Sequence, residues 1–160
     1  MKGKARLLGH PIHPMLIVLP LGLLPAAVVC DFVHLCTRGA LPAQMAYWLI
    51  AGGIAGGLLA SVFGFADWLA IPSQTRAKRI GALHALTNVA VMILFGASWF
   101  LRHGAPENPR SLAIVLGVVA LLLAAVSGWL GAELIYRLNV GVDEAANPNA
   151  PSSLHHEKIR

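Results

Sequence analysis

Charged side chains are scarce in this sequence. Asp, Glu, Lys and Arg together make up 12% of the 160 residues, whereas 57% of the residues are hydrophobic. Soluble globular domains carry about 25% charged residues. The mean hydropathy of +0.69 agrees with this contrast. The composition therefore excludes an ordinary soluble domain and predicts an integral membrane protein that contacts the lipid bilayer.

Cysteine is also rare, since the chain has only Cys30 and Cys36. The two residues do not form a Cys-x-x-Cys motif, and cysteine-based zinc sites and disulfide frameworks need several closely spaced cysteines. In a helix, their separation places them on different faces, which argues against a mutual disulfide. We interpret both as packing residues.

Four apolar segments are present in place of charge, and each is long enough to cross a bilayer, which takes about 20 residues of helix. The segments are 14–35, 46–71, 80–101 and 111–136. They are continuously apolar rather than alternating, which favours helices over a barrel. We predict an all-α, four-helix membrane bundle with up-down topology. It comprises residues 14–138, between an N-terminal arm (1–13) that carries the HPIHP turn and a polar, flexible tail (139–160).

Lysine and arginine are distributed unequally between the two ends of this predicted bundle. Most of them fall on the end shared by both termini and the middle loop, and only Arg38, Arg102 and Arg110 fall on the other. Cytoplasmic loops carry such an excess of positive charge. We therefore predict a multi-pass protein of the bacterial inner membrane with both termini in the cytoplasm. The net charge of +5 follows from this distribution, so it does not indicate a nucleic-acid partner.

The second segment contains the stretch AGGIAGG, which sets two small-xxx-small pairs side by side. The pairs are Gly52 with Gly56 and Gly53 with Gly57. Such pairs let another backbone approach closely. They are consistent with contacts inside the bundle and equally with a homodimer or a redox partner docked on this face.

Titratable side chains gather at the predicted cytoplasmic end. They are His10, His13, Asp67, His84 and Glu133, and they come from all four segments. Such groups are costly within a membrane and usually face the bundle interior, where they carry function. Imidazoles and carboxylates together suit transition metals. We predict a metal site for zinc, iron or copper with these five residues as ligands.

Prolines follow both histidines of the first segment. Pro11 and Pro14 disfavour helix in the residue before them, so we expect His10 and His13 to lie on an extended, stiffened turn over the mouth of the bundle. Pro14 then opens the helix at its first position, and Pro20 and Pro25 kink it. Asn88 lies one turn past His84, with Thr87 close by, and both are predicted to orient the ligands.

Simpler interpretations exist for each member of this group. Glu133 is placed to pair with Arg137 one turn later, Asp67 is within reach of the basic loop that follows it, and His84 is consistent with a packed histidine bonded to a carbonyl. At the other end, Asp31 and His34 lie one turn apart with no clear partner from another segment. His103 is expected in solvent, and His155 and His156 lie in the tail and carry no metal prediction.

Three stretches resemble the bacterial membrane-protein family catalogued as domain of unknown function 2231. They are GHPIHPMLIVLPLGL (9–23), GFADWLAIPSQTRAKRIGALHALTNV (64–89) and GAELIYRLNVGVD (131–143). The resemblance implies a four-span membrane domain without an assigned activity, and the family pattern carries over at His10, His13, Asp67, His84 and Asn88. Relatives often have histidine at the position of Glu133. Related domains joined to Rieske-type modules hint at redox work.

Three functions follow. The first is a membrane protein with the five-residue transition-metal site, in a redox-related role. The second is a haem b electron carrier with His84 and either His13 or His10 as axial ligands, because the first and third segments would face each other diagonally across a bundle. The third is an accessory or assembly subunit of a membrane complex that binds no cofactor.

Overall fold

Four helices long and apolar enough to span a membrane make up most of the computed structural model, which describes residues 5–154. They are α2 (Val18–Thr37), α3 (Ala40–Ala70), α4 (Arg76–Arg102) and α5 (Ser111–Ala132). A short helix, α1 (Ile12–Leu16), precedes α2, and a π-helical turn, η1 (Glu133–Arg137), continues α5. The predicted all-α membrane fold is confirmed. His155 and His156 lie outside the described residues.

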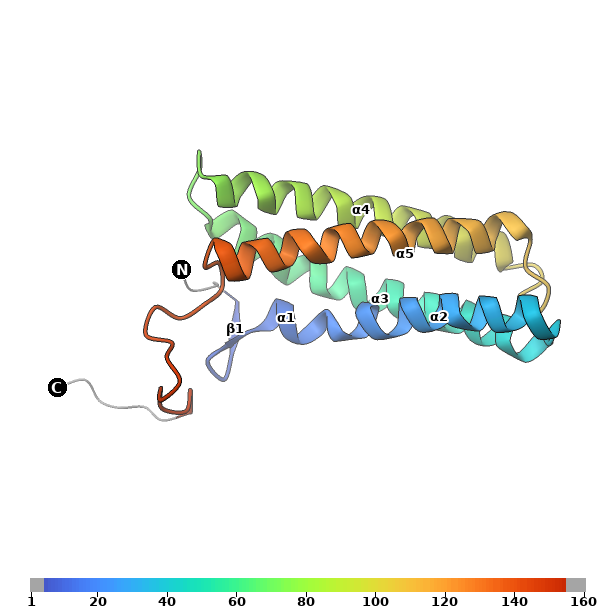
Figure 1. Cartoon of the computed structure of the whole chain (residues 1–160), viewed down its shortest axis with the longest axis horizontal. Coiled ribbons are helices and arrows are strands. Elements are labelled where there is room, and N and C mark those ends of the chain that lie inside the picture. Colours follow the sequence, from blue (N-terminus) through green and yellow to red (C-terminus); the bar gives the residue numbers. More distant parts are fainter. Residues whose placement is uncertain (1–4, 155–160) are drawn as a thin grey trace.

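The helices alternate in direction and form two hairpins (Figure 1). The first hairpin comprises α1, α2 and α3, and the second comprises α4, α5 and η1. The N-terminal strand β1 and the segment after η1 lie at the same end of the bundle, which we call the proximal end. The connections within each hairpin lie at the distal end. That the proximal end faces the cytoplasm stays a prediction.

The bundle core is small and its outer surface is strongly apolar. Leu24, Ala27, Ile50 and Phe95 are at most 5% exposed and form one cluster. Large apolar side chains cover the outside instead, as Trp48 illustrates with 70% of its surface exposed. Without a bilayer such a surface would be costly, so it is the surface that lipid covers.

The glycine-rich stretch of α3 packs inside the bundle. Gly53 and Gly56 are buried, and a Cβ atom added to them would collide with Leu24 and with Leu19 of α2. Close approach of α2 and α3 thus depends on these glycines. Contacts within the chain therefore account for Gly53 and Gly56. A homodimer or a redox partner on this face stays a prediction, and this packing does not support it.

Replacing Gly56 by alanine is expected to destabilise the first hairpin by about 1–3 kcal/mol, because overpacking forces side chains from their rotamers. The new Cβ would lie 2.6 Å from the Cβ of Leu19. Gly22→Ala in α2 is the matched control, since no atom lies within 4 Å of its added Cβ. Reversible unfolding in mixed detergent micelles measures both variants, and equal stabilities would contradict the packing role.

The helices differ from the predicted segments at three places, each for a local reason. The second span begins at Ala40 rather than residue 46, because Pro42 lies in the first turn, where proline is tolerated. The third begins at Arg76 rather than residue 80, since Thr75 caps it by accepting a hydrogen bond from the backbone N–H of Lys78. The first span is interrupted at Ile17; Pro20 has no N–H to donate to the carbonyl of Leu16.

The N-terminal arm differs from the predicted HPIHP turn. Strands β1 (Arg6–Leu7) and β2 (His10–Pro11) pair across a turn in which Leu8 and Gly9 both have positive φ. His10 is extended as expected, but His13 is helical, because α1 already begins at Ile12 and places Pro14 inside its first turn. The chain after η1 returns to this arm.

Candidate functional site

His84 is held at the proximal end of α4 by a fixed set of hydrogen bonds. Its Nδ1 lies 2.9 Å from the carbonyl oxygen of Ser127 in α5. A carbonyl can only accept, so Nδ1 carries the proton. Nε2 lies 3.1 Å from the Asn88 side-chain nitrogen one turn later. In the neutral ring, Nε2 therefore has the lone pair and accepts from Asn88.

His13 is held in the same way in the first hairpin. Its Nδ1 lies 2.9 Å from the carbonyl oxygen of Ala60 in α3. The carbonyl again requires that Nδ1 donate, which leaves the lone pair of the neutral ring on Nε2. Ala60 is 2% exposed, so the acceptor is shielded from water. Both histidines thus have the same tautomer, set by a backbone carbonyl of the neighbouring helix.

A glycine makes room for each imidazole. A Cβ atom at Gly64 would lie 2.8 Å from the His13 ring, and one at Gly131 would lie 3.2 Å from the His84 ring. Each glycine follows the residue that supplies the carbonyl by one helical turn. The bundle therefore brings one fixed imidazole from each hairpin to the proximal end.

The other predicted ligands are engaged elsewhere. His10 Nε2 lies 3.1 Å from Ser153 Oγ, and Asp67 Oδ1 accepts from the backbone N–H of Ala5 at 3.4 Å. Glu133 pairs with Arg76 at 2.7 Å rather than with Arg137. Within residues 5–154, no group of three or more His, Cys, Asp or Glu residues is arranged to hold a metal ion. The five-residue site stays a prediction.

The two residues predicted to orient the ligands have different positions. Asn88 contacts Nε2 of His84, as its spacing indicates. The Thr87 hydroxyl instead donates to the carbonyl of Leu83 in its own helix, at 2.8 Å. A threonine in a helix often satisfies itself in this way. Asn88 is therefore the residue of the two that touches the candidate site.

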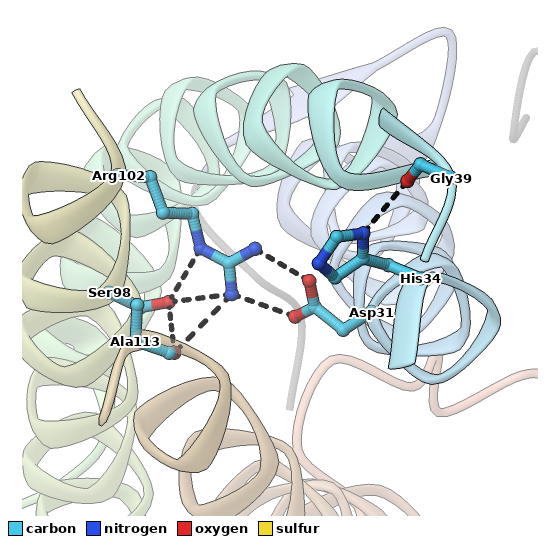
Figure 2. A network of polar contacts seen from close by, with 6 residues as sticks. All are labelled: Asp31, His34, Gly39, Ser98, Arg102 and Ala113. Atoms are coloured by element: carbon cyan, nitrogen blue, oxygen red, sulfur yellow. Dashed lines mark hydrogen bonds and ion pairs between the residues drawn. The ribbon is translucent and has the colours of Figure 1, made fainter. Parts of the chain in front are cut away.

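The distal end contains a buried ion pair that the sequence analysis missed (Figure 2). Arg102 of α4 donates from Nη1 and Nη2 to the two carboxylate oxygens of Asp31 in α2, at 2.6 and 2.7 Å. The two side chains are 0% and 1% exposed. Arg102 directly follows the predicted third segment (80–101), but α4 extends to residue 102 and keeps the guanidinium inside the bundle.

Further oxygen atoms surround the guanidinium of Arg102. Its Nε and Nη2 donate to Ser98 Oγ at 3.3 and 3.2 Å, and Nη2 also reaches the carbonyl of Ala113 at 3.3 Å. Buried ion pairs stabilise only when such bonds complete them. Two features of the sequence could have indicated this pair. Ser98 lies one helical turn before Arg102, and Asp31 lies near the same end of the bundle.

Two histidines also lie at the distal end. Figure 2 shows His34 next to Asp31, with its Nδ1 2.8 Å from the carbonyl oxygen of Gly39; the bond fastens the connection between α2 and α3. His103 is exposed, as expected, yet its Nδ1 lies 3.0 Å from the hydroxyl of Tyr47. Tyr47 in turn stacks on Trp99 at 5.3 Å. These contacts fasten the distal ends of the helices to one another.

Comparison with known proteins gives one match. A family model described as "Predicted membrane protein (DUF2231)" matches residues 9–144. No curated protein and no solved structure matches the chain. The matched region includes both hairpins and all the candidate residues described above.

Proposed function

The chain belongs to the DUF2231 family of predicted membrane proteins, and from this membership and the proximal geometry we propose that it binds a transition metal between His13 and His84. The metal serves a redox-related role at one end of the membrane bundle. The proposal takes its two ligands from the predicted set of five. It adds the reason why these two are suited to the task.

The observation that supports the proposal is the shared orientation of the two imidazoles. A histidine binds metal through an unprotonated nitrogen, and a hydrogen bond from its other nitrogen to a carbonyl fixes which one is free. Nδ1 of His13 and of His84 each lie 2.9 Å from a backbone carbonyl oxygen. Both Nε2 atoms then have the lone pair that a metal needs. Two histidines that served only to pack the helices would not need the same tautomer in both hairpins.

Asn88 fits the site as a residue that releases its contact on metal binding. Its amide lies against the Nε2 of His84, where it satisfies a lone pair that would otherwise be unpaired within the membrane. A bound metal would take this lone pair in place of the Asn88 amide.

Alanine variants of the two histidines test the proposal. His13→Ala and His84→Ala are each expected to lower the metal content of protein purified in mild detergent at least tenfold, since each removes half of the protein ligands. Elemental analysis of the same samples measures the content and identifies the metal. Iron or copper would support the redox role, whereas zinc would contradict it.

His10→Ala and Glu133→Gln are the controls for that experiment. Both residues belong to the wider predicted site, but His10 contacts Ser153 and Glu133 contacts Arg76. Metal content unchanged in these two variants supports the two-imidazole site. A loss as large as that of His84→Ala would overturn it in favour of the five-residue site. Absence of metal from the unmodified protein, also after incubation with iron and copper salts, would overturn both.

A further inference from the structure

The two hairpins carry their polar residues at equivalent positions. Asp31 and Arg102 are 71 residues apart, and the same separation relates His13 to His84. His84 and Arg102 lie on α4. In the first hairpin, His13 lies on α1 and Asp31 on α2, which follows it. The histidines lie at the proximal end and the charged residues at the distal end. One separation that relates both pairs is the mark of an internal repeat.

Packing repeats along with the polar residues. At the separation of 71, the buried residues Leu24 and Ala27 of α2 correspond to Phe95 and Ser98 of α4, which are also buried. Five of the seven buried residues of α3 have a buried counterpart in α5 at another constant separation. The corresponding pairs are Ala46 and Ala113, Tyr47 and Ile114, Ile50 and Gly117, Gly53 and Ala120, and Ala60 and Ser127. Gly64 and Gly131 beside the two imidazoles follow the same relation.

Both hairpins run in the same direction through the bundle (Figure 1). Parallel repeats of this kind are related by a pseudo-two-fold axis along the membrane normal. Residues at equivalent positions then face each other across the axis. Asp31 and Arg102 do so directly, since they form a bidentate pair. At the proximal end, His13 and His84 are the equivalent pair, and the axis passes between them.

We infer that the ligand between His13 and His84 is a haem, bound on this axis with one imidazole on each face of the porphyrin. The inference rests on the proposed metal site and specifies its occupant. A ligand on a two-fold axis presents the same chemistry to both sides. A planar macrocycle does so, because its iron has two equivalent axial positions that histidines of facing helices commonly fill.

The number of ligands favours haem over a bare ion. Zinc takes four ligands, whereas the described proximal end offers the imidazoles of His13 and His84. His10, Asp67 and Glu133 are held there in other contacts. The porphyrin brings four nitrogens of its own and needs only two from the protein. A linear copper(I) ion is the remaining two-ligand occupant, and it gives no visible Soret band.

Spectroscopy on the full-length protein tests the inference. The protein is expressed with a haem precursor and purified in mild detergent without imidazole. We expect about one haem per chain and the low-spin spectrum of two axial imidazoles. His13→Ala and His84→Ala should change the spectrum alike, to that of a five-coordinate haem or to loss of haem. Added free imidazole should restore the low-spin bands in each variant, which a structural role of the histidines would not produce.

Matched variants keep the outcome decisive. His10→Ala should leave the spectrum unchanged. If an alanine variant does not fold, as judged by helical circular dichroism and gel filtration, His84→Met provides an axial thioether in its place and should retain haem at a raised reduction potential.

Each result separates this inference from the proposed function. Stoichiometric metal without a Soret band, also after titration with hemin, would overturn haem and leave the metal site in place. Neither metal nor haem would overturn both. A spectrum that responds to only one of the two histidine variants would overturn the symmetric site.

Discussion

Arg102→Ala is expected to destabilise the bundle by about 3–5 kcal/mol, the usual cost of removing one partner from a buried ion pair. The substitution would leave the Asp31 carboxylate, which is 1% exposed, without its bidentate partner. It would also remove the donor to Ser98 Oγ, although the Ser98 hydroxyl would still donate to the carbonyl of Ala113 at 2.6 Å. Reversible unfolding in mixed detergent micelles, followed by circular dichroism, measures the change.

Two variants serve as controls for that prediction. Arg76→Ala breaks the proximal pair with Glu133, but the Arg76 side chain is 53% exposed, so we expect a loss below about 1 kcal/mol. The double variant Asp31→Leu, Arg102→Met replaces the buried pair by apolar groups and should recover most of the stability. If Arg102→Ala were no more harmful than Arg76→Ala, the distal pair would not stabilise the bundle.

The membrane fold could be predicted from the sequence because hydropathy alone decides it. Each of the four spans is longer and more apolar than a soluble core helix needs, and the bilayer leaves helices as the structure that satisfies their backbone. The ends of the helices were harder to predict. Pro42 and Arg76 both suggest loop, yet proline is tolerated in a first helical turn and Thr75 caps the helix that begins at Arg76.

The distal ion pair could not be found by the same reasoning. The positive-inside rule treats an arginine at the end of an apolar run as a loop charge, so from the sequence Arg102 indicates only the topology. Whether such a side chain points outward or into the bundle depends on how α4 rotates against its neighbours. Asp31 of α2, Ser98 and the carbonyl of Ala113 decide this for Arg102, and these contacts are tertiary.

For the proximal residues, the sequence predicts the end of the bundle at which they lie but not all of their contacts. Chain topology brings His13 and His84 to one end, and the spacing of Asn88 predicts its contact with His84. Topology gives only the depth of a residue in the bundle, however, and Asp67 and Glu133 share that depth while bonding to Ala5 and Arg76. The two carbonyls that fix the imidazoles carry no sequence signal, because any residue supplies a carbonyl.

Gly64→Ala is expected to lower the affinity of the proximal site for its metal about tenfold. This is the lower end of the loss in metal affinity found when residues that orient a metal ligand are changed. The new Cβ would lie 2.8 Å from the His13 ring and would push the imidazole away from the Ala60 carbonyl. The Cβ added by Gly131→Ala would lie 3.2 Å from the His84 ring. This contact is less close than the one at Gly64, so we expect a smaller loss of affinity. Metal content after dialysis against a graded chelator measures both.

Two further glycines separate this effect from helix propensity. Alanine at Gly96 in α4 or at Gly128 in α5 meets no atom within 4 Å, and alanine favours a helix by up to about 1 kcal/mol over glycine. These variants should therefore be at least as stable as the unmodified chain, with unchanged metal content. Gly64→Ala gains the same helix propensity, so a loss of metal without a loss of helix would follow from the displaced imidazole. Equal metal content in all four variants would contradict the part assigned to His13, because its ring could then bind from a position other than the one beside Gly64.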